Sequence, residues 1–242
     1  MKIIKVDAID STNTFLKDAL RNNSINSATC VWAKTQTNGR GQREAKWNSE
    51  PGKNLTFSVY LPVSEHINKT PFAINILTTI SIHKVLSKYN LINLKIKWPN
   101  DILSANKKIG GVLIENNYQK GQLLGTVIGI GLNVNQINFE FLPKASSIKN
   151  ILGTSLSLEE LLDAIIFEIT QRFKLYTAAN FKTIKEEFEE ILFRNKKPST
   201  FIAEGLDFPG IIQGITNDGK LIVLQEDQII KEYDLKQIQL KY

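Results

Sequence analysis

Residues 39–43 read Gly39-Arg40-Gly41-Gln42-Arg43, and they separate two stretches that we predict to be strands, at 29–34 and 55–61. Two glycines let a backbone turn tightly and approach a ligand closely. Two arginines carry forked, permanently charged donors that match carboxylate and phosphate oxygens. The pattern therefore predicts a loop, set between two strands of a sheet, that wraps an anionic ligand.

The residues around this loop do not form either of two common nucleotide-binding motifs. A Walker A loop needs Gly-x-x-x-x-Gly-Lys followed by Ser or Thr, and the spacing here differs. A Rossmann loop needs a third glycine, where Glu44 stands instead. Trp47 follows with a large flat face and one polar tip, so we expect a ligand that is partly flat as well as anionic.

The composition is that of an ordinary globular protein, with 242 residues, 42% hydrophobic and 22% charged. No uninterrupted apolar segment is long enough to span a membrane, and the first residues resemble a short strand rather than a signal peptide. We therefore expect a cytoplasmic protein with no membrane partner. The net charge of +6 suits an anionic small ligand, an acidic protein partner or weak nucleic-acid binding, and does not choose among them.

Cysteine and histidine usage narrows the chemistry further. Cys30 is the only cysteine, so an intrachain disulfide is excluded, and its place in a predicted strand favours a buried structural thiol over a nucleophile. His66 and His83 are the only histidines and lie far apart in the sequence. A zinc site built from cysteine and histidine is therefore not expected.

The order of predicted elements indicates an α+β fold, because strands and helices mix without the regular alternation of a parallel α/β sheet. Helices are predicted after an N-cap at Asp10 or Ser11, from Thr70-Pro71, after Ser157, and over residues 180–193. The predicted strands are Ile3–Val6, Thr29–Lys34, Leu55–Leu61, Leu94–Lys97, Gly111–Asn116 and Leu123–Asn133.

The character of the chain changes near residue 195. Short β-rich segments follow, and Asn217-Asp218-Gly219 between two of them is a hairpin signal. We therefore divide the chain into a main domain, residues 1–194, and a small C-terminal β-barrel, residues 195–242. The barrel is expected to lean on the main domain, because its own core is marginal.

Four further motifs each have a structural and a functional interpretation. Asp10-Ser11-Thr12-Asn13 caps a helix or binds a polar heterocycle, and Lys97-Trp98-Pro99-Asn100-Asp101 forms a turn or supplies a working carboxylate. Lys108-Ile109-Gly110-Gly111-Val112-Leu113-Ile114-Glu115 sets a cation beside a close backbone approach, either to a ligand or to a neighbouring strand. Gly129-Ile130-Gly131-Leu132-Asn133 is a closely packed strand, or ends in an amide that reads a base edge.

Taken in order over essentially the whole chain, these motifs and the loop resemble the biotin protein ligases. The resemblance implies a mixed sheet with surrounding helices, similar to class II synthetases, plus a C-terminal SH3-like β-barrel. It implies an ATP-dependent enzyme that makes biotinyl-5′-AMP and pyrophosphate, and then transfers biotin to a lysine of a biotin carboxyl carrier protein. Two anions must meet and the mixed anhydride must be kept from water, which suits positive donors and a closing loop.

The resemblance also implies roles for individual residues. Lys108, Arg40 and Asp101 are the expected catalytic residues, with Asp101 placing Mg²⁺ or the incoming lysine. Gln36 is expected at the carboxylate end of biotin. The expected biotin-binding residues are Ser11, Thr12, Asn13, Gln36, Arg40, Gly41, Gln42, Lys108, Gly110 and Gly111. The expected ATP-binding residues are Arg40, Arg43, Trp47, Asn100, Lys108 and Asn133.

Two departures from the family pattern are visible. Glu44 stands where many members have glycine, and Gln42 and Ala45 stand where some have arginine, so the loop is less basic. The first motif comes almost at once, which leaves no room for the DNA-binding winged helix of some relatives. We therefore expect a ligase without that domain and without a nucleic-acid partner. We expect the protein to be a monomer or a homodimer.

The nearest alternative is a lipoate protein ligase or transferase of related fold. Lipoate has no ureido group, so the polar Ser11, Thr12 and Asn13 favour biotin. A non-catalytic nucleic-acid-binding protein would need a basic face with aromatic side chains. The acidic residues of the C-terminal segment disfavour that alternative.

Overall fold

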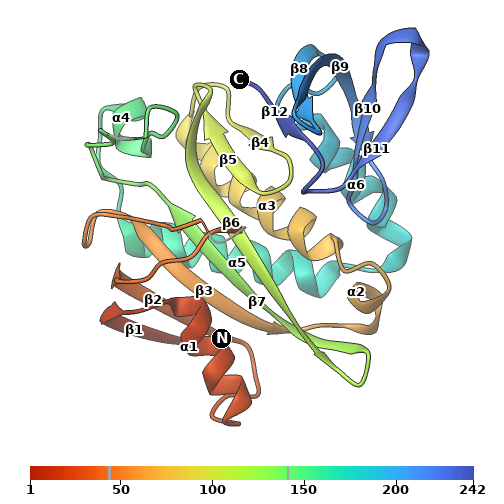
Figure 1. The fold of residues 1–242 in the computed structure, drawn as a ribbon. Helices are drawn as coiled ribbons and strands as arrows, with labels where there is room; N and C mark the ends of the chain where they lie inside the picture. The colour runs from red at the N-terminus through yellow and green to blue at the C-terminus, as the bar shows by residue number, and fades with distance from the viewer. Residues whose placement is uncertain (43–44, 141) are drawn as a thin grey trace.

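A seven-stranded mixed sheet forms the centre of the molecule (Figure 1). The computed structural model describes residues 1–42, 45–140 and 142–242. The strand order is β1-β2-β3-β7-β6-β5-β4, in which β1 and β2 are parallel and the other pairs are antiparallel. The strands are β1 (Lys2–Ile9), β2 (Thr29–Gln36), β3 (Leu55–Pro62), β4 (Lys95–Lys97), β5 (Asp101–Ser104), β6 (Lys107–Gln119) and β7 (Gln122–Leu132).

Because side chains alternate along each strand, the two faces of the sheet pack against different parts of the molecule. Val31, Tyr60 and Val127 pack with Leu16 of α1 (Thr12–Arg21) on one face. Their chain neighbours Cys30, Val59 and Ile128 belong to the larger core on the other face. Figure 1 shows α3 (Ala73–Leu86) and α5 (Leu158–Leu175) behind that second face.

Helix α3 is the central support of the sheet. Twelve of its fourteen residues are buried, which is the pattern of a helix enclosed on all sides rather than an amphipathic surface helix. Its hydroxyl groups remain satisfied, because Thr78, Thr79 and Ser81 donate to carbonyls in the preceding turn. The helix begins at Ala73 rather than at the predicted Thr70-Pro71, since the short helix α2 (Glu65–Lys69) and a turn occupy the preceding residues.

Most of the other predicted elements are confirmed. Ser11 caps α1 by accepting from the Thr14 N–H, and Ser157 caps α5 by accepting from the Glu160 N–H. The helix expected over 180–193 is α6 (Phe181–Glu190), which ends earlier because residues 191–195 turn toward β4 and toward β9 (Leu206–Ile215). Strand β5 and the short helix α4 (Ile148–Leu152) were not predicted.

The C-terminal residues form a second, antiparallel sheet of five strands in the order β11-β10-β9-β8-β12. The predicted hairpin at Asn217-Asp218-Gly219 joins β9 to β10. The predicted domain boundary and the SH3-like closure of this sheet stay predictions. The C-terminal strands are β8 (Pro198–Ala203), β9 (Leu206–Ile215), β10 (Leu221–Leu224), β11 (Ile230–Tyr233) and β12 (Gln239–Leu240).

The C-terminal sheet is fastened to the rest of the molecule by specific contacts. The Trp98 indole N–H donates to the Gly219 carbonyl at 2.9 Å, and the Ile215 N–H donates to the Glu189 carboxylate at 2.8 Å. Phe201 belongs to the same hydrophobic core as α3 and α5. The prediction that this segment leans on the main domain is therefore confirmed.

Cys30 is fully buried, and burial followed by the charge of Asp163 raises the pKa of its thiol to about 12. The prediction of a structural thiol is confirmed, since a protonated buried thiol is a poor nucleophile. Over the residues that the structure describes, no helix has the length and apolarity to cross a membrane.

Glu168 takes part in ion pairs that link three helices. Replacing it with a neutral side chain measures how much these ion pairs contribute to the stability of the protein. Glu168 pairs with Lys84 of α3 at 2.8 Å and with Arg172 of α5 at 3.1 Å, and Arg172 also pairs with Glu187 of α6. Glu168→Gln is expected to lower the free energy of unfolding by about 1–3 kcal/mol at pH 7, because it weakens two charged hydrogen bonds at a side chain that is 12% exposed. Urea denaturation measures the change.

The pH dependence of this effect has a defined sign. Burial alone would raise the pKa of Glu168, but Lys84 and Arg172 hold it below its ordinary 4.5. The stabilisation is therefore present above pH 4.5 and is lost as the pH falls through the lower folded-state pKa. The control Glu186→Gln, in an exposed pair, should change stability by less than about 0.5 kcal/mol. Equal effects of the two variants would contradict the assignment.

Candidate active site

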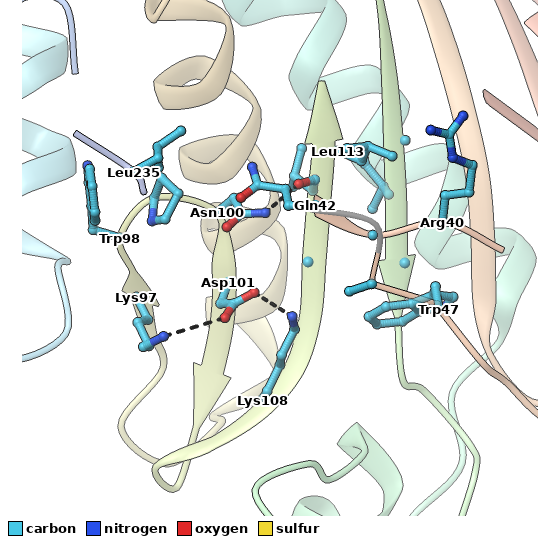
Figure 2. A pocket seen from close by; sticks show the side chains of 18 of the residues that line it. Arg40, Gln42, Trp47, Lys97, Trp98, Asn100, Asp101, Lys108, Leu113 and Leu235 are labelled. Carbon is cyan, nitrogen blue, oxygen red and sulfur yellow. Dashed lines mark hydrogen bonds and ion pairs between the residues drawn. The ribbon is translucent and has the colours of Figure 1, made fainter. Parts of the chain in front are cut away.

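A cavity of about 370 Å³ lies over one face of the large sheet, between the start of α1, the loop before β3, the turn between β4 and β5, and the C-terminal segment. Figure 2 shows Lys97 and Trp98 on one side of it, Arg40 and Trp47 on the other, and Asp101 and Lys108 between them. Most of the residues singled out in the sequence meet here. Those that line it are Ser11, Thr12, Asn13, Gln36, Arg40, Gly41, Gln42, Trp47, Asn100, Asp101, Lys108 and Gly111.

Strand register explains why residues so distant in sequence share this face. Ser58 of β3 pairs with Gly129 of β7, and Gly129 pairs with Leu113 of β6. The next row, two residues along, joins Gly131 to Gly111 and Gly111 to Asp101. Paired residues of antiparallel strands point to the same side of a sheet, so these rows form the floor of the cavity.

Glycine in β7 makes room for side chains above that floor. A Cβ on Gly131 would overlap the indole ring of Trp47, and a Cβ on Gly129 would overlap the Asn13 amide. The Trp47 indole nitrogen is buried and has no partner among the described residues, and Lys108 Nζ lies 5.9 Å from the ring centroid. A flat aromatic surface beside a cation is therefore held against the sheet.

One end of the cavity is polar and nearly neutral. The Thr12 backbone N–H and hydroxyl both lie within hydrogen-bond distance of Gln36 Oε1, at 2.8 and 3.0 Å. Thr12 and Asn13 are 3% exposed, and both bond to the buried hydroxyl of Ser58. Gln36 therefore lies with Thr12 at this polar end, and its expected contact with the carboxylate of biotin stays a prediction.

The other end of the cavity is charged. Asp101 Oδ1 lies 2.5 Å from Lys108 Nζ, and its other oxygen lies 3.8 Å from Lys97 Nζ (Figure 2). The Asn100 amide donates to the Val112 carbonyl at 2.6 Å, which fixes the turn that carries Asp101. Two ammonium groups around one carboxylate leave net positive charge where an anionic ligand group can bind.

The loop over the cavity folds back on itself. Arg40 and Lys46 form an isolated β-bridge, the Gly41 N–H donates to the Ala45 carbonyl at 2.7 Å, and the Trp47 N–H donates to the Gly39 carbonyl at 2.9 Å. This arrangement sets Arg40 and Trp47 on the cavity. Arg43 and Glu44, the first an expected phosphate contact, lie outside the described residues.

A resident metal ion does not fit the side chains present. Among the described residues no group of three His, Cys, Asp or Glu side chains is placed to hold one. Asp101 is a single carboxylate that already has lysine partners. Such a carboxylate suits Mg²⁺ only where substrate phosphates supply most of the ligands, which is the usual manner of Mg²⁺ binding at nucleotide sites.

Two expected site residues are placed elsewhere. Gly110 is packed beneath Leu132 of β7, so its missing side chain serves strand packing. The Asn133 amide donates to the Ser146 carbonyl at 3.0 Å and holds the segment before α4. Neither is among the residues that line the cavity.

Other residues of the cavity region had no assigned role in the sequence analysis. Trp98, Lys97 and Glu115 lie within quoted motifs, and they became informative only once their partners were known. Ser58 lies in an apolar strand, and the C-terminal residues Leu235, Ile238, Gln239 and Leu240 line the cavity. No local sequence signal marks Ser58 or these C-terminal residues, because contacts between distant parts of the chain bring them to the site.

The chain matches the model of the Biotin/lipoate A/B protein ligase family over residues 6–133, which is more than half of its length. It belongs to that family. The resemblance indicated by the ordered motifs is thereby confirmed.

Known members of the family agree with this assignment over nearly the whole chain. The chain is 29% identical over 238 residues to the "Bifunctional ligase/repressor BirA" of Bacillus spizizenii, covering 96% of this chain and 72% of that protein. It is 27% identical to the Aquifex aeolicus biotin protein ligase solved with biotin and ATP, with a TM-score of 0.81 over 99% of this chain and 98% of the other. The Leishmania major ligase, at 23% identity and a TM-score of 0.66 over 97% and 99%, shares the fold.

Two glycine substitutions distinguish a glycine that serves strand packing from a glycine that makes room for Trp47 at the cavity. Gly110→Ala is expected to lower the free energy of unfolding by about 1–3 kcal/mol, because the added methyl group meets Leu132 and the Gly131 carbonyl. Gly131→Ala is expected to displace Trp47 and change tryptophan emission at a smaller cost in stability, because a loop side chain can move away. Urea denaturation and fluorescence of both variants measure the contrast, and an unchanged emission for Gly131→Ala would contradict it.

Proposed function

We propose that this chain is a biotin protein ligase, which forms biotinyl-5′-AMP from biotin and ATP and transfers biotin to a lysine of a biotin carboxyl carrier protein. The observation that carries the proposal is one cavity with two chemically different ends, polar at Thr12 and Gln36 and cationic at Lys108. A cyclic urea suits the first end, and carboxylate and phosphate suit the second. The Aquifex relative, solved with biotin and ATP, supports binding of both.

In the first step a carboxylate oxygen of biotin attacks the α-phosphorus of ATP, and pyrophosphate leaves. Both reactants are anions, so their approach needs positive charge that is already in place. Lys108 would exchange part of its contact with Asp101 for the carboxylate and the α-phosphate, and Arg40 would add a second cation from the loop. Mg²⁺ carried by ATP would neutralise phosphate charge, and Asp101 is the carboxylate that would hold it.

In the second step the amine of the carrier lysine attacks the acyl carbon of biotinyl-5′-AMP, and AMP leaves. The adenylate must be kept from water until that lysine arrives. The described part of the loop, residues 39–42 and 45–47, lies over the cavity and would exclude water there, while Asp101 would orient the incoming amine. We place this reaction in the cytoplasm, where the carrier protein is the partner.

The related alternative is a lipoate protein ligase. The dithiolane ring of lipoate carries no N–H donor and no carbonyl. The polar end of this cavity, where the ring would bind, has Thr12, Asn13 and Gln36 with polar atoms directed at one another. Burying those groups against a purely apolar ring would leave acceptors unsatisfied. The polar end therefore favours biotin.

An exchange assay decides between the two acids. With biotin, ATP and labelled pyrophosphate, the protein is expected to catalyse biotin-dependent ATP–pyrophosphate exchange and to show little exchange with lipoate. Exchange that depends on lipoate and not on biotin would overturn the proposal, and so would the absence of exchange with either acid.

Charge removal tests the cationic end. Lys108→Ala and Arg40→Ala are each expected to slow adenylate formation by about 10²–10³-fold, because each removes a donor from the developing charge at phosphorus. Single-turnover formation of biotinyl-5′-AMP measures the rate. Lys107→Ala, an exposed lysine at the start of the same strand, is the matched control and should stay within about twofold of the parent protein. Near-normal rates for both site variants would show that the roles are assigned wrongly.

A further inference from the structure

A chain of hydrogen bonds runs from the polar end of the cavity through the buried interior of the site. The Thr12 hydroxyl lies 2.6 Å from the Ser58 hydroxyl, which donates to Asn13 Oδ1 at 2.5 Å. The Asn13 amide donates to Glu115 Oε2 at 2.8 Å, and Lys17 Nζ lies 2.6 Å from Glu115 Oε1. Ser58 is fully buried, and Thr12 and Asn13 are nearly so.

The charge of Glu115 determines the direction of this chain. Burial alone would raise the pKa of Glu115, but Lys17, Asn13 and Arg40 lower it below its ordinary value, so the group is a carboxylate that only accepts. Asn13 must then turn its NH₂ toward Glu115 and its oxygen toward Ser58. The single hydroxyl proton of Ser58 is used on that oxygen, so the 2.6 Å contact needs the proton of Thr12.

Two acceptor oxygens are left facing the same space. With its proton committed to Ser58, Thr12 Oγ1 presents only lone pairs elsewhere. Gln36 Oε1 lies 3.0 Å from it and accepts from the Thr12 backbone N–H, which fixes it as an oxygen. Both residues line the cavity, so an N–H donor of a ligand would satisfy both acceptors.

The backbone leaves room for this row of hydrogen bonds. A Cβ at position 129 would collide with the Asn13 amide, so glycine there lets Asn13 lie flat on β7. Ser58 pairs with Gly129, and Glu115 pairs with Val127 one step along the same face. Thr12, Asn13 and Lys17 of α1 therefore form one hydrogen-bonded row with Ser58 of β3 and Glu115 of β6, above the space that Gly129 of β7 leaves.

We propose that Ser58 and Glu115 are positioning residues that hold the Thr12 hydroxyl as an acceptor for a ring N–H donor, and thereby select a cyclic urea over a ring without donors. This inference rests on the proposed biotin ligase function and adds residues that do not touch the ligand. Without Ser58, the Thr12 proton turns to Gln36, and the pair of acceptors is lost. Without the charge at 115, Asn13 can adopt either amide orientation.

A matched pair of β3 variants tests the proposal. Ser58→Ala removes the relay hydroxyl, whereas Thr56→Val removes a buried hydroxyl two residues away that bonds only to the Ala33 carbonyl. By calorimetry, Ser58→Ala is expected to weaken binding of biotin about 3–10-fold, the usual effect of one hydrogen bond, and to weaken dethiobiotin equally because it keeps the urea. Thr56→Val should bind both ligands as the parent protein does.

Glu115→Gln provides a second variant at a partly exposed side chain, so the test does not depend on Ser58→Ala folding. It is expected to raise the KM for biotin about 3–10-fold and to change the KM for ATP much less, because the hydrogen bonds that start at Glu115 lead only to the ring end of the cavity. Octanoate, which has no ring donors, should inhibit the parent and both variants equally.

Unchanged biotin affinity in Ser58→Ala and Glu115→Gln would overturn the inference, and so would an equal loss for ATP or octanoate, which would mark a general structural role. Measurements on the parent protein distinguish a failure of this inference from a failure of the proposed function. If the parent catalyses biotin-dependent exchange while the variants bind biotin normally, only the inference is wrong. If the parent neither binds nor activates biotin, the proposed function is wrong and the inference falls with it.

Discussion

The antiparallel pairing of β7 with β3 and β6 is the constraint on which the rest of the site depends. Alternation along β7 sends Ile128, Ile130 and Leu132 into the core and leaves Gly129 and Gly131 on the opposite face. Glycine at these two positions leaves the space in which Asn13 and Trp47 lie directly on the sheet. One strand therefore carries both the apolar support and the floor of the cavity, and a slip of one residue would exchange them.

Charge is distributed over this floor in two separate groups. Asp101 with Lys97 and Lys108 forms a group of net positive charge, and Glu115 with Lys17 anchors a neutral, directional network. Both groups are fixed by β6 and its neighbours before any ligand binds. Such preorganisation suits a reaction between two anions, because little reorientation is needed when charge develops on phosphorus.

Local patterns in the sequence predicted much of this arrangement. The Ser11 cap, the buried Cys30 and the paired glycines could be recognised because each reflects its immediate neighbours in the chain. Sequence patterns could not show that Ser58 lies at the site, that Trp98 bonds to Gly219, or that C-terminal residues line the cavity. Pairing and contacts between distant parts of the chain decide these positions. The sequence likewise did not show that Gly110 packs against Leu132 or that the Asn133 amide bonds to Ser146, because a glycine or an amide in a strand does not show which face of the sheet it lies on. Their roles toward a ligand stay predictions.

We propose that one cavity holds a cyclic urea at Thr12 and an α-phosphate at Lys108. A crystal structure of the protein with biotinyl-5′-AMP would locate both groups. We expect a ring N–H within hydrogen-bond distance of both Thr12 Oγ1 and Gln36 Oε1, with Lys108 Nζ on the phosphate. A ring bound away from Thr12, or a phosphate that Lys108 does not contact, would contradict it.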